Sequence, residues 1–500
     1  MPSNRRFGSC LKQIMERHEM SIAETARRMR LKSSTSLARI LHDEASLKTT
    51  RKFYQALLAL DPLPFTAEEM RRLEQALGVD LLGPERYDAF RQLDRIVFPG
   101  PAAAAHPCLK VTVHAGSGLP ENLSTQRLME YLSACPDIQL TMTGCCSEAL
   151  VNTLASLLRE GAPQKKRNFV HYLHDAFRSS ARLVKMISVI RPLLPYPTYN
   201  AYICDSRVLP DETAGIYEGN NLLCQATDAS GARRMFHCVM VGPEDFFLTE
   251  YHDPAVFSFQ LAMLRQIQPY LSPVKDLFPA HATPEDYVAY TENYRRLEHA
   301  RPIYSVIPDV PLNFIQVDIL LAVLQDAARE NEFAASPEFR ALLSQLYVIQ
   351  DQRAHNMFEK RQVSHYIFSY PAMAEFARTG MQSDHFFAMR PYTPAERRQI
   401  LQTLRDNMAG NPFFHLYFAK DDALSFQMEI TCYEGLGVLM LNADTSYTLG
   451  DDLSETLITE ENFTNLFISY FQEELIPNHV HSPKESLALM DQLLFALPRE

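Results

Sequence analysis

Apolar residues in the first 97 positions recur at the three- and four-residue spacing of amphipathic helices. The clearest runs are Leu11, Ile14 and Met15, then Phe53, Ala56, Leu57 and Leu60, and then Met70, Leu73 and Leu77. Ser21 and Thr66 each precede a glutamate by three positions, the spacing of a capping box at the start of a helix. Asp61-Pro62 is expected to end one helix and Gly78 another. This pattern predicts a compact all-α domain over residues 1–97.

Proline, glycine and small residues dominate the segment PGPAAAAHP, which predicts a linker over residues 98–107. Beyond the linker the period changes. Lys110–His114 and Asp137–Thr143 are predicted strands, separated by a predicted helix near Thr125–Ala134. Strands that alternate with helices predict an α/β (α+β) region.

The order helix, strand, hairpin, helix occurs twice in this region. The first set is predicted at Ser179–Leu194, Tyr199–Asp205, Asn221–Val241 and Ala255–Gln268. The second set is predicted at Pro394–Met408, Phe413–Ala419, Leu424–Leu441 and the helix that carries Phe463, Leu466, Phe467, Tyr470 and Phe471. Residue identities do not repeat, so element order alone suggests two similar halves, 108–290 and 291–500. The mostly helical stretch Asn313–Met357 is expected to bridge them.

Length and composition place the chain among globular proteins of two to four domains, with 500 residues and 46% hydrophobic residues. No stretch approaches the ~20 apolar residues of a membrane span, so no membrane partner is expected. No apolar run follows the first arginines, so no secretory signal is predicted. Nine cysteines without a C-x-x-C pair are interpreted as reduced thiols, which favours a cytoplasmic protein.

Charge is distributed unevenly along the chain. The first 53 residues hold 12 Lys and Arg against five Asp and Glu, a net charge of +7, whereas the whole chain carries −12. A basic N-terminal segment on an acidic remainder is typical of a nucleic-acid-binding head. A solvated basic helical surface has the same composition, so charge alone does not decide between the two.

Residues 21–42 have the layout of a helix-turn-helix, in which the second helix enters the major groove. Ala26 is the small residue of the first helix, and Leu31, Leu37 and Ile40 are the apolar positions that fix the second. The remaining positions are predicted to face DNA, with Arg39 suited to a guanine edge. The predicted DNA-binding residues are Lys32, Ser33, Ser34, Thr35, Ser36, Arg39, His42, Arg27 and Arg28, with Arg5 and Arg6 as further candidate phosphate contacts.

The segment SIAETARRMRLKSSTSLARILHDEASL resembles the Cro/C1-type (XRE-like) repressor domains. The matching points are Thr25-Ala26, Met29, Leu31, Ser34-Thr35, Leu37 and Arg39-Ile40. The resemblance covers about residues 8–80 and implies a five-helix domain that binds double-stranded DNA as a homodimer, and hence a transcriptional regulator. Arg30 stands where a glycine is usual and the turn is one residue longer, which leaves the base-contacting set open.

Other classes of protein fit part of the pattern. A helical bundle used only for protein contact has the same capping boxes, and an enzyme that handles phosphates or nucleotides can carry an appended helical head. A peptide-sensing regulator of helical repeats is disfavoured by the hairpins and by the missing 34-residue period. On the leading interpretation the C-terminal region binds a small-molecule or peptide effector, or drives oligomerisation.

No strong catalytic, metal or cofactor motif occurs in residues 108–500. Gly116-Ser117-Gly118 lacks the third glycine of a dinucleotide loop. His171 and His174 are placed on a predicted helix as structural histidines, and Cys145-Cys146 is expected to be buried. His479 and His481 are expected in a solvated loop. The two halves look like a phospholipase D-like fold by element order, but its H-x-K pattern is absent, which implies a sensor or scaffold without catalytic residues.

Overall fold

A computed structural model gives the architecture of the chain. It describes residues 6–28, 34–60, 65–98, 110–113, 125–144, 147–159, 165–173, 179–204, 220–242, 245–278, 284–299, 301–308, 310, 314–329, 337–358, 362–381, 390–420, 428–442 and 455–497. The chain divides into two compact units, unit 1 (Met1–Gln92) and unit 2 (Leu93–Glu500). None of the described helices is long and apolar enough to cross a membrane.

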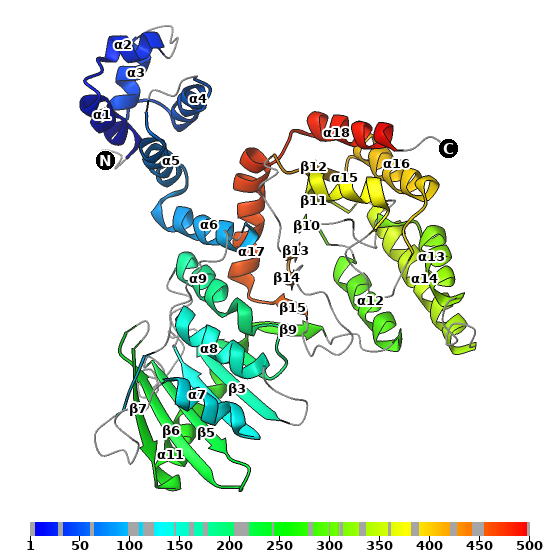
Figure 1. Cartoon of the computed structure of the whole chain (residues 1–500). Coiled ribbons are helices and arrows are strands. Elements are labelled where there is room, and N and C mark those ends of the chain that lie inside the picture. The colour runs from blue at the N-terminus through cyan, green and yellow to red at the C-terminus, as the bar shows by residue number, and fades with distance from the viewer. Residues whose placement is uncertain are drawn as a thin grey trace. The chain divides into compact units, whose positions relative to one another are not determined.

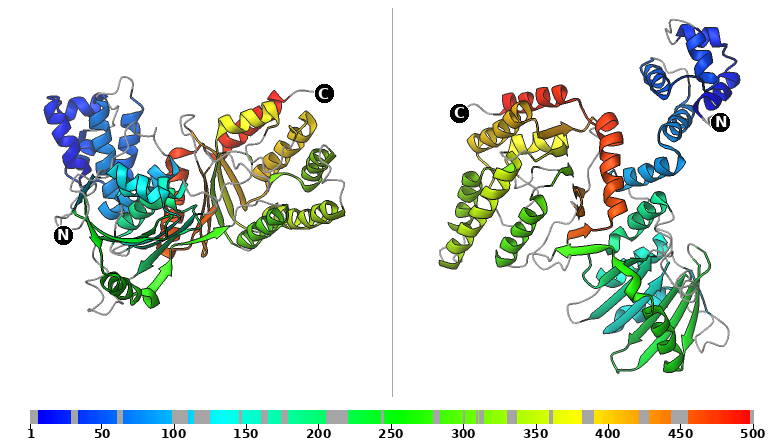
Figure 2. Two further views of the ribbon diagram at one scale, coloured as in Figure 1. Left: turned by 60° about the horizontal axis from the view of Figure 1, so that its bottom comes forward. Right: turned by 180° about the vertical axis from the view of Figure 1, so that it is seen from behind.

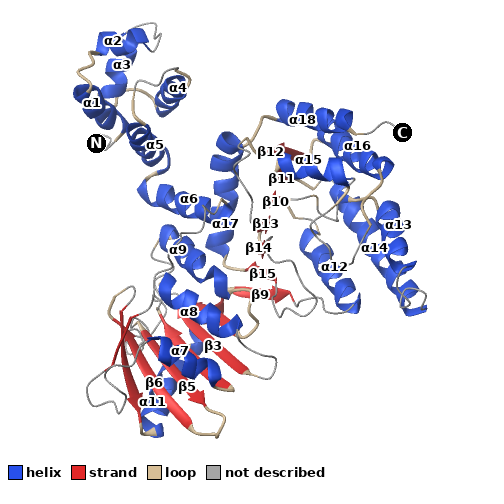
Figure 3. Ribbon diagram, viewed as in Figure 1, coloured by secondary structure: helices blue, strands red, loops and turns tan. Residues whose placement is uncertain are grey.

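Unit 1 is helical throughout its described part, as the sequence predicts (Figures 1 and 3). Its helices are α1 (Phe7–Arg17), α2 (Ile22–Arg28), α3 (Ser34–Leu41), α4 (Leu47–Leu58), α5 (Ala67–Leu82) and α6 (Pro84–Val97), the last of which continues into unit 2. The predicted apolar positions form its core, including Leu11, Leu37, Phe53 and Leu73. Apart from Phe98, the predicted linker lies outside the described residues.

Two details of unit 1 differ from the sequence prediction. Helix α4 buries Tyr54, whereas the predicted core residue Ala56 is exposed. Gly78 does not end α5, which continues to Leu82, and Gly83 ends it with φ +82°. Gly78 has another role, because a Cβ there would lie 2.2 Å from the Tyr87 ring. Glycine is therefore required for close packing of α5 against α6.

Unit 2 contains two mixed sheets. The first has strand order β1-β7-β6-β5-β2-β3-β4-β8 and the second has order β12-β11-β10-β13-β14-β15-β9. The strands of the first are β1 (Lys110–Val113), β2 (Asp137–Thr143), β3 (Lys166–Leu173), β4 (Tyr199–Cys204), β5 (Asn221–Thr227), β6 (Arg233–Met240), β7 (Asp245–Tyr251) and β8 (Leu271–Pro273). Those of the second are β9 (Lys275–Phe278), β10 (Ile303–Ile307), β11 (Ser364–Phe368), β12 (Phe414–Phe418), β13 (Met428–Tyr433), β14 (Gly437–Asn442) and β15 (Glu455–Ile458).

The two sheets share one strand pattern. Strands β2, β3 and β4 run parallel, and β5, β6 and β7 follow antiparallel on the other side of β2. Strands β10, β11 and β12 run parallel in the same way, and β13, β14 and β15 follow antiparallel beside β10. The element order noted in the sequence therefore extends to strand order and direction, in an α+β architecture. Only Val274 separates β8 of the first sheet from β9 of the second.

Helices cover both sheets. Those of the first half are α7 (Thr125–Ala134), α8 (Glu148–Arg159), α9 (Ser180–Ile190), α11 (Pro254–Arg265) and the short turns η2 (Arg191–Leu193) and η4 (Gln268–Tyr270). Those of the second are α12 (Pro284–Glu298), α13 (Val317–Arg329), α14 (Pro337–Phe358), α15 (Tyr370–Thr379), α16 (Pro394–Gly410), α17 (Glu461–Tyr470), the π-helix η7 (Phe471–His479) and α18 (Pro483–Ala496). Figure 2 shows α11 on the face of the first sheet opposite α7, α8 and α9.

Helix α11 of the first half and helix α17 of the second take equivalent places, because each follows the last antiparallel strand of its own half. Helices α12–α16 and α18 form the large core on the other face of the second sheet, around Tyr366, Phe368 and Phe414. Of the strands missed in the sequence, β10 (IYSVI) and β11 (SHYIF) are short and mostly apolar, and periodicity cannot separate such runs from buried helix.

Candidate nucleic-acid interface

Helix α2 begins where the sequence predicts. The Ser21 hydroxyl accepts a hydrogen bond from the Glu24 backbone N–H at 3.1 Å, and the Thr25 hydroxyl donates to the Ser21 carbonyl at 3.0 Å. Thr25 and Ala26 are both buried, so the small side chain of Ala26 faces the core. This cap holds the first helix of the candidate helix-turn-helix.

Helix α3 has two contrasting faces. Leu37, Ile40 and Leu41 are buried in the core of unit 1, as predicted. The side chains of Ser34, Thr35, Ser36 and Arg39 are exposed, and so is His42 just after the helix. The exposed face thus presents three hydroxyls and a guanidinium within eight residues, and these groups are suited to phosphates and base edges.

Arg39 is the strongest base-reading candidate among these residues. Its Nη2 atom lies 3.4 Å from the Glu44 carbonyl oxygen, a long hydrogen bond to backbone rather than to a carboxylate. Arg39 therefore carries no salt bridge within the described part of unit 1, and exchanging this weak contact for a guanine edge costs little.

Of the other predicted DNA-binding residues, Arg27 and Arg28 lie on α2. Arg27 is exposed on α2. Lys32 and Ser33 lie outside the described residues, as do Met29, Arg30 and Leu31, so the predicted turn and its unusual arginine fall there too. Arg28 ends α2, and its side chain is not among those described.

Two contacts that sequence reasoning missed hold α1, one to the end of α3 and the other to α5. The Asp43 carboxylate accepts a hydrogen bond from the Gly8 backbone N–H at 3.3 Å, and Asp43 itself has a left-handed φ of 57° that ends α3. Asp80 of α5 accepts from the Arg6 and Phe7 N–H groups at 2.7 and 2.9 Å, which caps α1. No local motif reveals Asp80, because it is more than 70 positions from its partners.

Gly8→Ala should destabilise the α1–α3 contact. The new Cβ would lie 2.3 Å from the Ile40 carbonyl oxygen and 2.7 Å from Asp43 Oδ1, distances that force the helices apart. Alanine improves helix propensity by about 1 kcal/mol, but overpacking costs about 1–3 kcal/mol, so we expect net destabilisation. Hydrogen exchange of the full-length protein, followed by mass spectrometry, should show faster exchange in α1 and α3.

Ser9→Ala is the matched control, since Ser9 is the next residue of α1 and is exposed. Unchanged exchange in Gly8→Ala, or an equal change in Ser9→Ala, would contradict the close approach of α1 to α3.

Of the remaining sequence candidates, His171 is placed differently from the prediction. It lies on strand β3 rather than on a helix, is wholly buried, and shares a 2.7 Å hydrogen bond with the Tyr199 hydroxyl. The helix prediction failed because β3 alternates on a half-buried sheet, which the H-x-x-H spacing conceals. His174, Cys145, Cys146 and the segment Gly116–Gly118 lie outside the described residues.

His479 does not occupy a loop as expected, whereas His481 lies in the short connection before α18. His479 ends the π-helix η7, and both imidazoles are about one-third exposed. Val480 between them is buried and forms a β-bridge with Ala419. Among the described residues no group of three or more His, Cys, Asp or Glu is arranged to hold a metal ion.

Comparison of the chain with protein-family models and with curated proteins finds no match. The functional interpretation therefore depends on the residues and their geometry.

Proposed function

We propose that this protein is a sequence-specific DNA-binding transcriptional regulator and that α3 of unit 1 is its recognition helix. The observation that carries the proposal is the two-faced character of α3. Three aliphatic side chains on one face of α3 are buried, and Ser34, Thr35, Ser36 and Arg39 are exposed on the other face. In a helix-turn-helix, the N-terminal residues of the second helix contact base edges.

The charge distribution supports the same proposal. The net charge of +7 over the first 53 residues attracts a phosphate backbone, whereas the acidic remainder of the chain repels it. Exposed Arg27 on α2 is suited to a phosphate contact, because the first helix of the motif crosses the backbone.

The finer parts of the proposal follow from the resemblance to Cro/C1-type repressors. The protein would act as a cytoplasmic homodimer, with two recognition helices separated by about 34 Å, one turn of duplex. Unit 2 would serve as the ligand-sensing or oligomerisation region, with a phospholipase D-like arrangement that has no catalytic residues. The repeated strand order of its two sheets supports a shared ancestry of the halves.

Arg39→Ala should weaken binding to the selected operator by about 10–100-fold and relax specificity at one base pair. The operator is first obtained by selecting from a random duplex library with the full-length protein. Affinity is then measured by fluorescence anisotropy at several salt concentrations, since phosphate contacts make affinity salt-dependent.

Arg71→Ala provides the control, because Arg71 is an exposed arginine of α5 that is paired with Glu68 and lies outside α3. It should bind the operator as the unaltered protein does. If the library yields no enriched duplex, or if Arg39→Ala keeps both affinity and specificity, α3 is not a recognition helix.

A further inference from the structure

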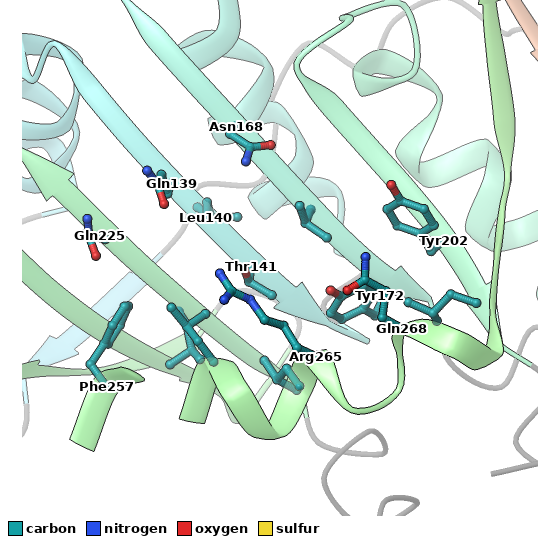
Figure 4. Close-up of a pocket in the computed structure, with 15 residues that line it drawn as sticks. Gln139, Leu140, Thr141, Asn168, Tyr172, Tyr202, Gln225, Phe257, Arg265 and Gln268 are labelled. Atoms are coloured by element: carbon teal, nitrogen blue, oxygen red, sulfur yellow. The ribbon is translucent and has the colours of Figure 1, made fainter. Parts of the chain in front are cut away.

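A pocket of about 200 Å³ lies between the first sheet and helix α11, entirely within unit 2 (Figure 4). Strands β2, β3 and β5 form its floor, and α11 with the following turn forms its wall. The volume is below the roughly 300–1,000 Å³ of sites for drug-sized ligands, so a smaller molecule is the expected occupant.

Three carboxamide side chains form a row across the pocket floor. Gln139 on β2 pairs in register with Asn168 on β3 and with Gln225 on β5. Adjacent strands lie about 4.8 Å apart and paired side chains share one face, so the three amides stand side by side, as Figure 4 shows. We call Gln225, Gln139 and Asn168 the carboxamide row.

A single positive charge faces this row. Arg265 ends α11, and Figure 4 shows its side chain extending over the floor toward Thr141. The described residues that line the pocket include no Asp or Glu. No side-chain hydrogen bond or salt bridge joins Arg265 or a member of the carboxamide row to another described residue. Their hydrogen-bonding groups are therefore available to a bound molecule.

Apart from Thr141, Gln268 and the hydroxyls of Tyr172 and Tyr202, the rest of the pocket lining is apolar. Phe257, Leu264 and Tyr172 belong to a buried cluster that joins α11 to the sheet, and Leu261 packs against it. This wall provides apolar contact for part of a ligand, and the row opposite provides donors and acceptors. A few polar groups placed on a mostly apolar, preformed surface are the usual composition of a small-molecule site.

The second half shows what this face looks like when it is closed by packing. Tyr304, His365 and His415 pair in register across β10, β11 and β12, and their rings stack at centroid distances of 5.4 and 4.5 Å. Phe471 of η7 lies edge-on against Tyr304, and the Tyr304 hydroxyl accepts a hydrogen bond from the Gln472 side chain at 2.9 Å.

Equivalent faces of the two sheets are thus covered by different kinds of side chain. In the second half aromatic rings occupy it under α17 and η7, and in the first half amides and a guanidinium line a hollow under α11. The fold does not require the amides and the guanidinium of the first half, because stacked rings fill the equivalent face of the second half.

We propose that the α11 pocket binds a small organic anion, a carboxylate or phosphate ester whose remaining edge carries hydroxyl or amide groups. The anion pairs with Arg265, and the polar edge bonds to the carboxamide row. Amides both donate and accept, so hydroxyls of either orientation find a partner. This inference is independent of DNA binding by unit 1.

Titration calorimetry of the full-length protein tests the proposal with malate, 3-phosphoglycerate and glucose 6-phosphate as probes. At least one should bind saturably, and glycerol and glucose, which lack the charge, should bind at least about tenfold more weakly. Malate distinguishes a carboxylate site from the phosphate site that glucose 6-phosphate reports. Arg265→Gln should weaken the best probe by about 10–100-fold, and Gln139→Leu should weaken it by a smaller factor.

Arg159→Gln is the matched control, because Arg159 is also an exposed arginine in the last turn of a helix, on α8. It should bind the probe unchanged. If none of the three anions binds, or if Arg265→Gln binds as tightly as Arg159→Gln, the pocket is not an anion site. Circular dichroism of each variant confirms that a loss reflects the site rather than the fold.

Discussion

Replacing Arg353 with methionine should lower the free energy of unfolding of unit 2 by about 3–5 kcal/mol. Arg353 on α14 donates through Nε and Nη2 to the two carboxylate oxygens of Glu298, at 2.8 and 2.6 Å. The two side chains are only 8% and 5% exposed, and the guanidinium lies 5.2 Å from the centre of the Tyr294 ring. The substitution leaves the Glu298 carboxylate buried beside an apolar side chain, and a buried charge that has lost its partner destabilises the fold.

The double variant Arg353→Met with Glu298→Leu tests whether the stability lost in Arg353→Met comes from the buried charge left on Glu298. Removing both charges removes the buried carboxylate that Arg353→Met leaves without its guanidinium, so the double variant should recover most of the stability lost in Arg353→Met. Chemical denaturation followed by circular dichroism gives the transition midpoints. Arg378→Met is the surface control, since Arg378 and Glu375 are 71% and 57% exposed and water screens their attraction, so the loss should be small. If Arg353→Met and Arg378→Met lose equal amounts of stability, the buried pair does not contribute more to the stability of unit 2 than the surface pair.

Sequence patterns predicted the elements of unit 1 well because its helices are amphipathic and capped locally. The apolar spacing of Leu37, Ile40 and Leu41 placed α3, and the Thr66 capping box placed the start of α5. The failures came from tertiary contacts. Asp80 caps α1 from a distant helix, and Gly78 continues α5 because Tyr87 occupies the space where a side chain would be.

In unit 2 the element order along the sequence predicted two similar halves, and the strand order and direction of the two sheets agree with this prediction. Strand register was not predictable, and register is what builds the α11 pocket. Gln139, Asn168 and Gln225 are each an ordinary polar position of a half-buried strand when taken alone. They become a row only because β2 pairs with β3 and β5 in one particular alignment. A one-residue slip would turn the amides to the opposite face.

Stability of unit 2 should rise as pH increases from about 7 toward 8.5, and Lys275 is the cause. Lys275 begins β9, directly after the residue that separates the two sheets, and is 8% exposed. Its ammonium donates to the carbonyl oxygens of Leu194 and Tyr196, the latter at 3.0 Å, and lies 5.5 Å from the centre of the Tyr199 ring. Burial lowers the pKa of Lys275 from 10.5 to about 7.

The direction of this change in stability with pH follows from how many protons the folded and unfolded chains bind. Between the two pKa values the unfolded chain keeps a proton on Lys275 that the folded chain has released, so unfolding takes up a proton and is disfavoured as pH rises. Below about pH 7 both states are protonated, and the full cost of the buried charge is present. Each unit of pKa difference corresponds to about 1.4 kcal/mol, so we expect a gain of about 2 kcal/mol by pH 8.5. Above that pH the buried thiols of Cys135, Cys224 and Cys432 oppose the trend, because burial raises their pKa values and the unfolded chain releases their protons first.

Lys275→Met tests this assignment, because it removes the titrating group and keeps an unbranched side chain of similar length. The unaltered protein should show denaturation midpoints that increase between pH 7 and about 8.5, before the cysteines and tyrosines of the unfolded chain lose most of their protons. Lys275→Met should lose this increase, whereas Lys185→Met, which removes an exposed lysine of α9, should retain it. A Lys275→Met variant that keeps the increase would place the titrating group elsewhere, and the junction between the sheets would then hold no buried charge that affects stability.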